Sequence, residues 1–146
     1  MDNEKKIKML QMIYVGALAD SVLRLDREGI LLKVTADKKQ EQLAEGKLRA
    51  AQLGIQRPTQ VFSILPEIFG CANWTTEQNN EGFIATATNC MLCGLSKKLE
   101  TGSPCNIYCL DAMEGLIKGL DESAEYNVIS TLWSQNECKV MVKTVK

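Results

Sequence analysis

Four of the six cysteines in this 146-residue chain lie in one short stretch with the spacing C-x2-C-x11-C-x3-C. Cys90 and Cys93 form the first pair, and Cys105 and Cys109 form the second. One turn of helix brings residues three or four apart onto the same face, so each pair can offer two sulfurs to one point. Four converging thiolates are suited to zinc first and to an iron–sulfur cluster second.

Two other interpretations of these cysteines remain open, namely free thiols, inert or reactive, and disulfides. Cysteine often serves as a small buried hydrophobic residue. A chain that is not exported usually keeps its thiols reduced, which favours metal-binding or catalytic thiols over disulfides.

The chain contains no histidine. This excludes Ser-His-Asp triads, Cys-His pairs and HExxH zinc sites, so proton transfer would fall to carboxylates, lysines, tyrosines or thiols.

Length and charge set the class of protein. The length is that of a single domain, residues 1–146. A net charge of −1 argues against a nucleic-acid partner, which requires clustered positive charge. The chain begins with acidic residues, which argues against a signal peptide. Charged residues interrupt the apolar run of residues 7–25, which argues against a membrane span. We therefore expect a cytoplasmic protein without a membrane partner.

The N-terminal part, residues 1–69, is predicted to form three helices. They are expected over residues 7–25, over about 37–53 with Thr35 or Asp37 as cap, and from Pro58 onward with a break or kink at Pro66. Gly29 and Gly54 suit the left-handed position after the first two helices. The apolar face of residues 7–25 is so wide that we expect it to pack on a partner subunit, giving a homodimer.

The cysteine-rich part, residues 70–146, is predicted to have the element order β-β-α-α-β-β. The expected elements are strands at 71–76 and 82–88, a short helix capped by Asn89, a helix from Ser103 to Leu120, and strands at 126–133 and 138–145. The sequence thus predicts an α+β domain with an antiparallel sheet of about four strands and helices packed on one face. Cys71 begins the first strand and is assigned no role.

Residues 70–146 resemble the L-2-amino-thiazoline-4-carboxylic acid hydrolase family and, more remotely, vinyl-reductase-type small-molecule-binding domains. The resemblance rests on a strand running into Cys90, on a Cys105-x3-Cys109 pair that opens a helix with Asp111 just beyond, and on Cys138 at the start of an alternating last strand. The turn before Cys138 reads Ser134-Gln135, where the family usually has Gly-Asp.

The resemblance implies a hydrolase that opens the C–N bond of a ring amidine or amide in a small molecule, using cysteine thiolates. Cys105 and Cys109 are the candidate nucleophiles, and Cys105 lies at a helix N-terminus, where the dipole favours a thiolate. Asp111 and Glu114 are the nearest acids for the role of base, although acids at such spacing usually form a solvated helix face.

The resemblance also implies a metal set of Cys90, Cys105, Cys109 and Cys138, with Cys93 peripheral on the surface. Local spacing alone puts Cys93 in place of Cys138, and one zinc cannot take both sets because its sulfurs lie about 2.3 Å from one point. A closed four-cysteine zinc site is structural. Two alternatives to the hydrolase therefore remain, a ligand-binding or sensing domain with structural zinc and an iron–sulfur protein.

Overall fold

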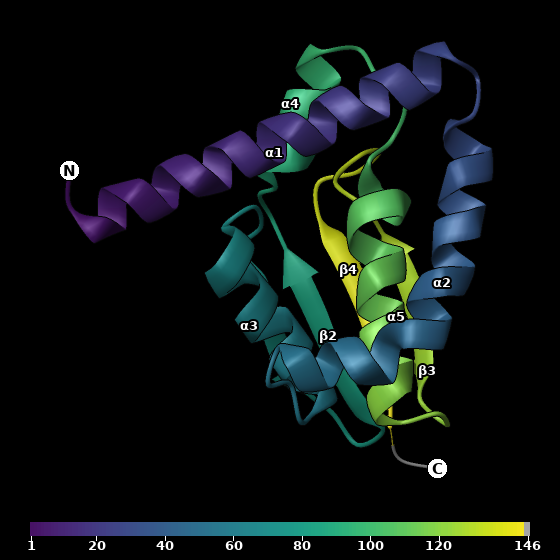
Figure 1. Ribbon diagram of the computed structural model, residues 1–146. Helices are drawn as coiled ribbons and strands as arrows, with labels where there is room; N and C mark the ends of the chain where they lie inside the picture. Colours follow the sequence, from purple (N-terminus) through teal and green to yellow (C-terminus); the bar gives the residue numbers. More distant parts are fainter. Residues whose placement is uncertain (145–146) are drawn as a thin grey trace.

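The computed structural model describes residues 1–144. The chain forms an α+β domain, as predicted (Figure 1). Its elements in chain order are α1 (Asn3–Arg27), α2 (Leu31–Gln52), α3 (Pro58–Phe69), β1 (Thr75–Gln78), β2 (Gly82–Ala87), α4 (Met91–Lys98), the π-helix η1 (Asn106–Leu110), α5 (Asp111–Leu120), β3 (Glu125–Ser130) and β4 (Cys138–Lys143).

The sheet has the strand order β1-β2-β4-β3, and every neighbouring pair is antiparallel. Its inner face follows from the period-two alternation of the two central strands. The buried side chains are those expected from that alternation, namely Phe83, Ala85 and Ala87 on β2 and Cys138, Val140 and Val142 on β4. The helices pack against the sheet, which confirms the predicted architecture.

Helix α2 packs closely along α5, which itself lies over the sheet. The close approach depends on glycine, because a Cβ atom on Gly46 would run into the carbonyl oxygen of Gly115. With the backbones in contact there, the part of α2 before Gly46 is held above the N-terminal end of α5 and the π-helix. This placement brings Gln42 over the residues that begin the cysteine-rich helix.

Helix α1 lies across one end of the domain, and its N-terminal half extends beyond the rest of the fold (Figure 1). Val15, Ala19 and Val22 in its second half are buried. In contrast, a set of large apolar side chains before and around Tyr14 is exposed, namely Ile7, Met9, Leu10, Met12, Ile13 and Tyr14. None of the helices in residues 1–144 combines the length and apolar character needed to cross a membrane.

Helix α3 continues unbroken through Pro66 to Phe69 and is capped by Gly70, whose φ is +65°. Three local expectations were wrong. Helix α2 begins at Leu31, so neither Thr35 nor Asp37 caps it, and the side chain of Thr35 bonds the carbonyl of Leu31 at 2.7 Å inside the helix. The first strand, expected at 71–76 with Cys71 at its start, is Thr75–Gln78. Helix α4 is capped by Cys90 and not by Asn89. The left-handed positions predicted after the first two helices are correct, since φ is positive at both glycines.

The start of the long C-terminal helix is a π-helix, which the sequence analysis did not anticipate. The Oγ atom of Ser103 accepts a hydrogen bond from the N–H of Cys105 at 3.2 Å, so the predicted helix start is nearly correct. In the wider turn that follows, the N–H of Asp111 bonds the carbonyl of Asn106. The side chains of the same two residues are joined as well, Nδ2 to Oδ1, at 3.0 Å. Single π-turns inside α-helices are often found at functional sites.

Candidate functional site

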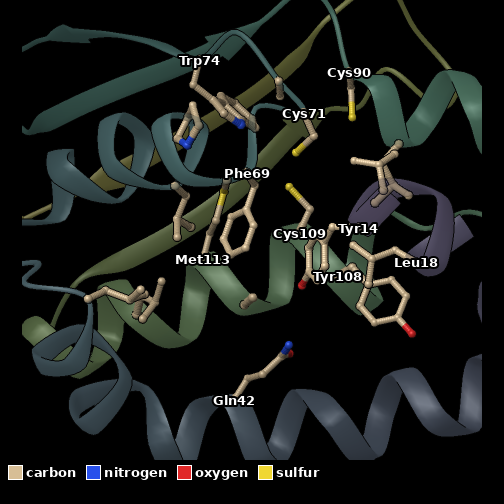
Figure 2. Close-up of a pocket in the computed structure, with 18 of the residues that line it drawn as sticks. Tyr14, Leu18, Gln42, Phe69, Cys71, Trp74, Cys90, Tyr108, Cys109 and Met113 are labelled. Atoms are coloured by element: carbon tan, nitrogen blue, oxygen red, sulfur yellow. The ribbon is translucent and has the colours of Figure 1, made fainter. Parts of the chain in front are cut away.

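A cavity of about 270 Å³ lies between α1, α2, α3 and the π-helix with α5 (Figure 2). Its lining is mainly apolar and aromatic, with three cysteines and a few polar side chains. The main contributors are Tyr14, Leu18, Gln42, Phe69, Cys71, Trp74, Cys90, Tyr108, Cys109 and Met113. The ring of Tyr14 stacks on that of Phe69, with centroids 5.3 Å apart, and joins the first helix to the third. Apolar cavities with a few convergent polar groups are typical ligand sites.

Gln42 points from α2 into this cavity (Figure 2). Only 7% of its surface is exposed, and its Oε1 atom is buried without a hydrogen-bond partner. Its Nε2 atom donates only a long hydrogen bond of 3.5 Å to the carbonyl of Ile107 in the π-helix. A buried, unpaired acceptor costs about 1–3 kcal/mol, so such groups are rare in folded proteins. Because Gln42 lines the cavity, a donor on a ligand could pair with this acceptor after a small rotation of the amide.

The π-helix brings two consecutive side chains, Tyr108 and Cys109, into the cavity lining. The hydroxyl of Tyr108 is 2.7 Å from the Oγ atom of Ser21 on α1, and the Nζ atom of Lys38 lies 5.6 Å from the centre of its ring. These contacts fix the tyrosine ring between the first two helices. Lys38 also lines the cavity, and it adds a positive charge close to Gln42 along the same helix.

Cys90 is the cysteine whose surroundings most favour the reactive thiolate form. It is the N-cap of α4, and its Sγ atom accepts the N–H of Cys93 at 3.4 Å. Hydrogen bonding by the neighbouring Cys71 thiol and by backbone amides lowers the pKa of Cys90 to about 6, although burial opposes the shift. The same interaction, together with burial, raises the pKa of Cys71, so Cys90 is the more acidic thiol of the two.

The remaining cysteines are held as neutral thiols. Burial is the main cause that raises the pKa values of Cys105, Cys109 and Cys138, and it raises that of Cys93 to about 12. The Sγ atom of Cys138 accepts the N–H of Leu132 at 3.1 Å. Together with Cys90, these four line a second, much smaller cavity of about 20 Å³ beneath the first. Cys90 and Cys109 line both cavities.

The predicted metal sets are thus brought into one region without forming a metal site. Within residues 1–144, no three cysteine or carboxylate side chains form a group that could hold a metal ion. All six cysteines are free thiols. Cys93 is buried, with 3% of its surface exposed, so its predicted surface position was wrong. Zinc and an iron–sulfur cluster stay predictions. The cysteines as arranged do not form a four-sulfur cage for either of them.

Asp111 and Glu114 are both buried and not on a solvated helix face. Asp111 is tied to Asn106, and burial raises its pKa. Glu114 lies 3.4 Å from the Nζ atom of Lys118 and 3.9 Å from that of Lys39. Neither carboxylate is among the residues that line the two cavities. Their positions therefore fit a role in holding the π-helix and α2 against α5 better than the predicted role of base.

The sequence analysis missed Gln42, Cys71, Trp74 and Tyr108. Gln42 lies in a polar stretch of α2 that resembles a solvated helix face, and only the contact with α5 buries it. Cys71 lies outside the dense cysteine spacing, and it reaches Cys90 through an isolated bridge between Ala72 and Cys90. The one available signal was that Cys71 precedes a strand whose partner ends just before Cys90.

Comparison with known proteins finds no family model, no curated protein and no solved structure that matches this chain. The resemblance to the hydrolase family therefore rests on its cysteine motifs alone.

Proposed function

We propose that this protein binds a small, mainly apolar molecule that carries a hydrogen-bond donor, and that the cavity beside Gln42 holds it. The observation that carries this proposal is the buried, unpartnered Oε1 atom of Gln42, a residue that lines a cavity of about 270 Å³. A dry apolar cavity of about 150 Å³ accommodates benzene, so the size here suits a fused bicyclic ring. The donor on the ligand would pair with Oε1.

Calorimetric titration with two matched compounds tests this proposal. 2-Naphthol carries a donor, and 2-methoxynaphthalene has nearly the same shape without one. We expect 2-naphthol to bind more tightly by about tenfold, which corresponds to about 1.4 kcal/mol. Ala112 lines the cavity, so Ala112→Leu should fill it and abolish binding, whereas Ala36→Leu at an exposed position of the neighbouring helix should not. Equal binding to both helix variants would contradict the proposal.

We propose cysteine-dependent hydrolysis of a ring amidine as a second function, because the pKa of one thiol at the cavity is lowered to about 6. The nucleophile would be Cys90 and not the expected Cys105 or Cys109, whose pKa values are raised. Cys71, which lines the same cavity, would supply a proton to the amidine nitrogen. Incubation with 2-amino-thiazoline-4-carboxylate, followed by mass spectrometry, should show ring opening that Cys90→Ser abolishes and Cys105→Ser retains. Turnover by Cys90→Ser would exclude this function.

We also propose that the protein forms a homodimer through the exposed part of α1. Ile7, Leu10 and Ile13 are each more than half exposed and lie on one side of a helix that extends beyond the fold. A symmetric dimer uses the same patch twice, so this stripe can pack against its own copy. The patch continues to Tyr14 at the cavity, so the partner would also cover one edge of the ligand site.

Light scattering at micromolar concentration should show a dimer for the wild-type chain and a monomer for Leu10→Glu. Leu32→Glu is the matched control, because Leu32 is equally apolar and even more exposed, 84% against 66%, on a different helix. A monomeric wild-type protein, or a dimer that survives Leu10→Glu, would contradict the proposed interface.

A further inference from the structure

Cys71 and Cys90 are held side by side by backbone contacts that do not depend on either thiol. Cys71 follows α3 and Cys90 precedes α4, and the two segments meet in the isolated bridge between Ala72 and Cys90. Next to this bridge, the N–H of Met91 donates to the carbonyl of Cys71 at 2.7 Å. Both side chains are part-buried and both line the larger cavity, where their sulfurs point toward the same region (Figure 2).

The two thiols have different surroundings, and this assigns them different roles. The Cys90 sulfur accepts a hydrogen bond from the Cys93 amide at the N-terminus of an eight-residue helix. Negative charge on sulfur is stabilised there by the amides and the helix dipole. Cys71 does not lie at a helix N-terminus, and the bond from the Met91 N–H to its carbonyl places it beside Cys90. The third sulfur at the cavity, that of Cys109, has no bridged partner segment.

We propose that Cys71 and Cys90 form a dithiol couple that reduces a small apolar organic hydroperoxide in the cavity and closes to a Cys71–Cys90 disulfide. The apolar lining, including Leu18, Trp74 and Leu92, selects the class of oxidant. A second thiol would be idle in simple addition to an electrophile, whereas it is required to convert an oxidised sulfur into a disulfide. This inference rests on the proposed binding of an apolar molecule in the same cavity.

The reaction balances in two steps. The Cys90 sulfur attacks the terminal oxygen of the hydroperoxide, the O–O bond breaks, and the alkoxide leaves as an alcohol with the proton of the Cys71 thiol. Cys90 is then a sulfenic acid. The Cys71 sulfur attacks the Cys90 sulfur, the S–O bond breaks, and the hydroxide leaves as water with a proton from solvent. Two equivalents of a low-molecular-weight thiol restore the dithiol by exchange and are released as their own disulfide.

The test uses the reduced full-length protein with cumene hydroperoxide, which is aromatic, and with hydrogen peroxide. We expect one equivalent of cumyl alcohol per chain and a disulfide that peptide mapping assigns to Cys71 and Cys90. Hydrogen peroxide should react more slowly, by about tenfold, because it gains nothing from the apolar cavity. A disulfide between other cysteines, or equal rates for the two oxidants, would overturn the proposal.

Three serine variants separate the roles. Cys90→Ser should lower alcohol formation by at least about tenfold, because the attacking sulfur is lost. Serine is a good N-cap, so this variant should keep its fold, which circular dichroism checks. Cys71→Ser should stop at a sulfenic acid that dimedone traps on Cys90. Cys93→Ser should react like the wild type, because the Cys93 side chain does not line the larger cavity and serine keeps the backbone N–H that bonds Cys90. Wild-type rates in Cys90→Ser would refute the assignment.

The outcome also separates this inference from the proposed binding function. If 2-naphthol binds and cumene hydroperoxide leaves all thiols reduced, the dithiol chemistry is wrong and ligand binding stands. If neither compound occupies the cavity, as judged by calorimetry, both proposals fail. Hydrolysis of an amidine leaves the number of free thiols unchanged, whereas the reaction proposed here removes two.

Discussion

Replacing Gln42 by methionine should stabilise the empty protein while it removes the preference for a ligand that carries a hydrogen-bond donor. Methionine has a similar length and no polar atom, so it relieves the buried Oε1 atom that lacks a partner. That relief is worth about 1–3 kcal/mol. The lost Nε2 hydrogen bond is long, at 3.5 Å, and contributes less than about 1 kcal/mol. We therefore expect a net gain of about 1 kcal/mol in the free energy of unfolding.

Urea unfolding of the wild type, Gln42→Met and Gln40→Met measures this gain. Gln40 is exposed on the same helix, so its substitution should change the free energy of unfolding by less than about 0.5 kcal/mol. A gain of 1 kcal/mol corresponds to about 2–4 °C in melting temperature for a domain of this size. Titration should then show that Gln42→Met no longer distinguishes 2-naphthol from 2-methoxynaphthalene.

Loss of stability in Gln42→Met by more than about 1 kcal/mol would refute the reasoning, because it would mean that Oε1 is satisfied in the folded protein. Retained preference for 2-naphthol would refute it in a second way, by showing that the ligand donor pairs elsewhere. A stabilising substitution that removes a function is the usual sign of a residue kept for binding and not for folding.

Three further predictions follow from the same site. The rate at which iodoacetamide alkylates Cys90 should fall as pH decreases through about 6, because only the thiolate reacts, and a midpoint above 8 would contradict the hydrogen-bonded pair. If the protein binds zinc, elemental analysis after purification without oxygen should show that Cys138→Ser lowers the zinc content and Cys93→Ser does not. The reverse result would favour the metal set that contains Cys93 in place of Cys138. Asn106→Ala should lower the free energy of unfolding by about 1–3 kcal/mol, since it leaves the buried carboxylate of Asp111 without its partner, and a change within 0.5 kcal/mol in urea unfolding would argue against that role.

The fold was largely predictable because its signals are local. Alternation on β2 and β4 identified the buried faces, and the glycines after α1 and α2 marked helix ends through their positive φ. The errors at Thr35 and Asn89 have one cause in common. Each residue type is common at helix caps, but a neighbouring segment places the helix start at a different residue. Helix α2 extends backward to Leu31, and the bridge to Ala72 positions Cys90 at the start of α4.

The site was less predictable because it depends on contacts between distant parts of the chain. Cysteine spacing selected the right region, and Cys90 and Cys109 do line the cavity. Spacing cannot reveal that the segment of Cys71 lies beside Cys90, joined by the bridge between Ala72 and Cys90. It also cannot reveal that Gln42 is buried, because a glutamine on a charged helix normally faces water, and its burial follows from the contact between Gly46 and Gly115.

The π-turn at Asn106–Leu110 acts as an insertion within a helix. A π-turn takes up one more residue than a regular turn, so deleting one residue here would restore a regular helix with one fewer side chain in that turn. Tyr108 or Cys109 would then leave the cavity while α5 kept its place on the sheet. Relatives that lack this one residue should therefore share the fold and have a differently lined cavity. Chain length between Pro104 and Asp111 thus becomes a marker of ligand specificity that can be read from sequences alone.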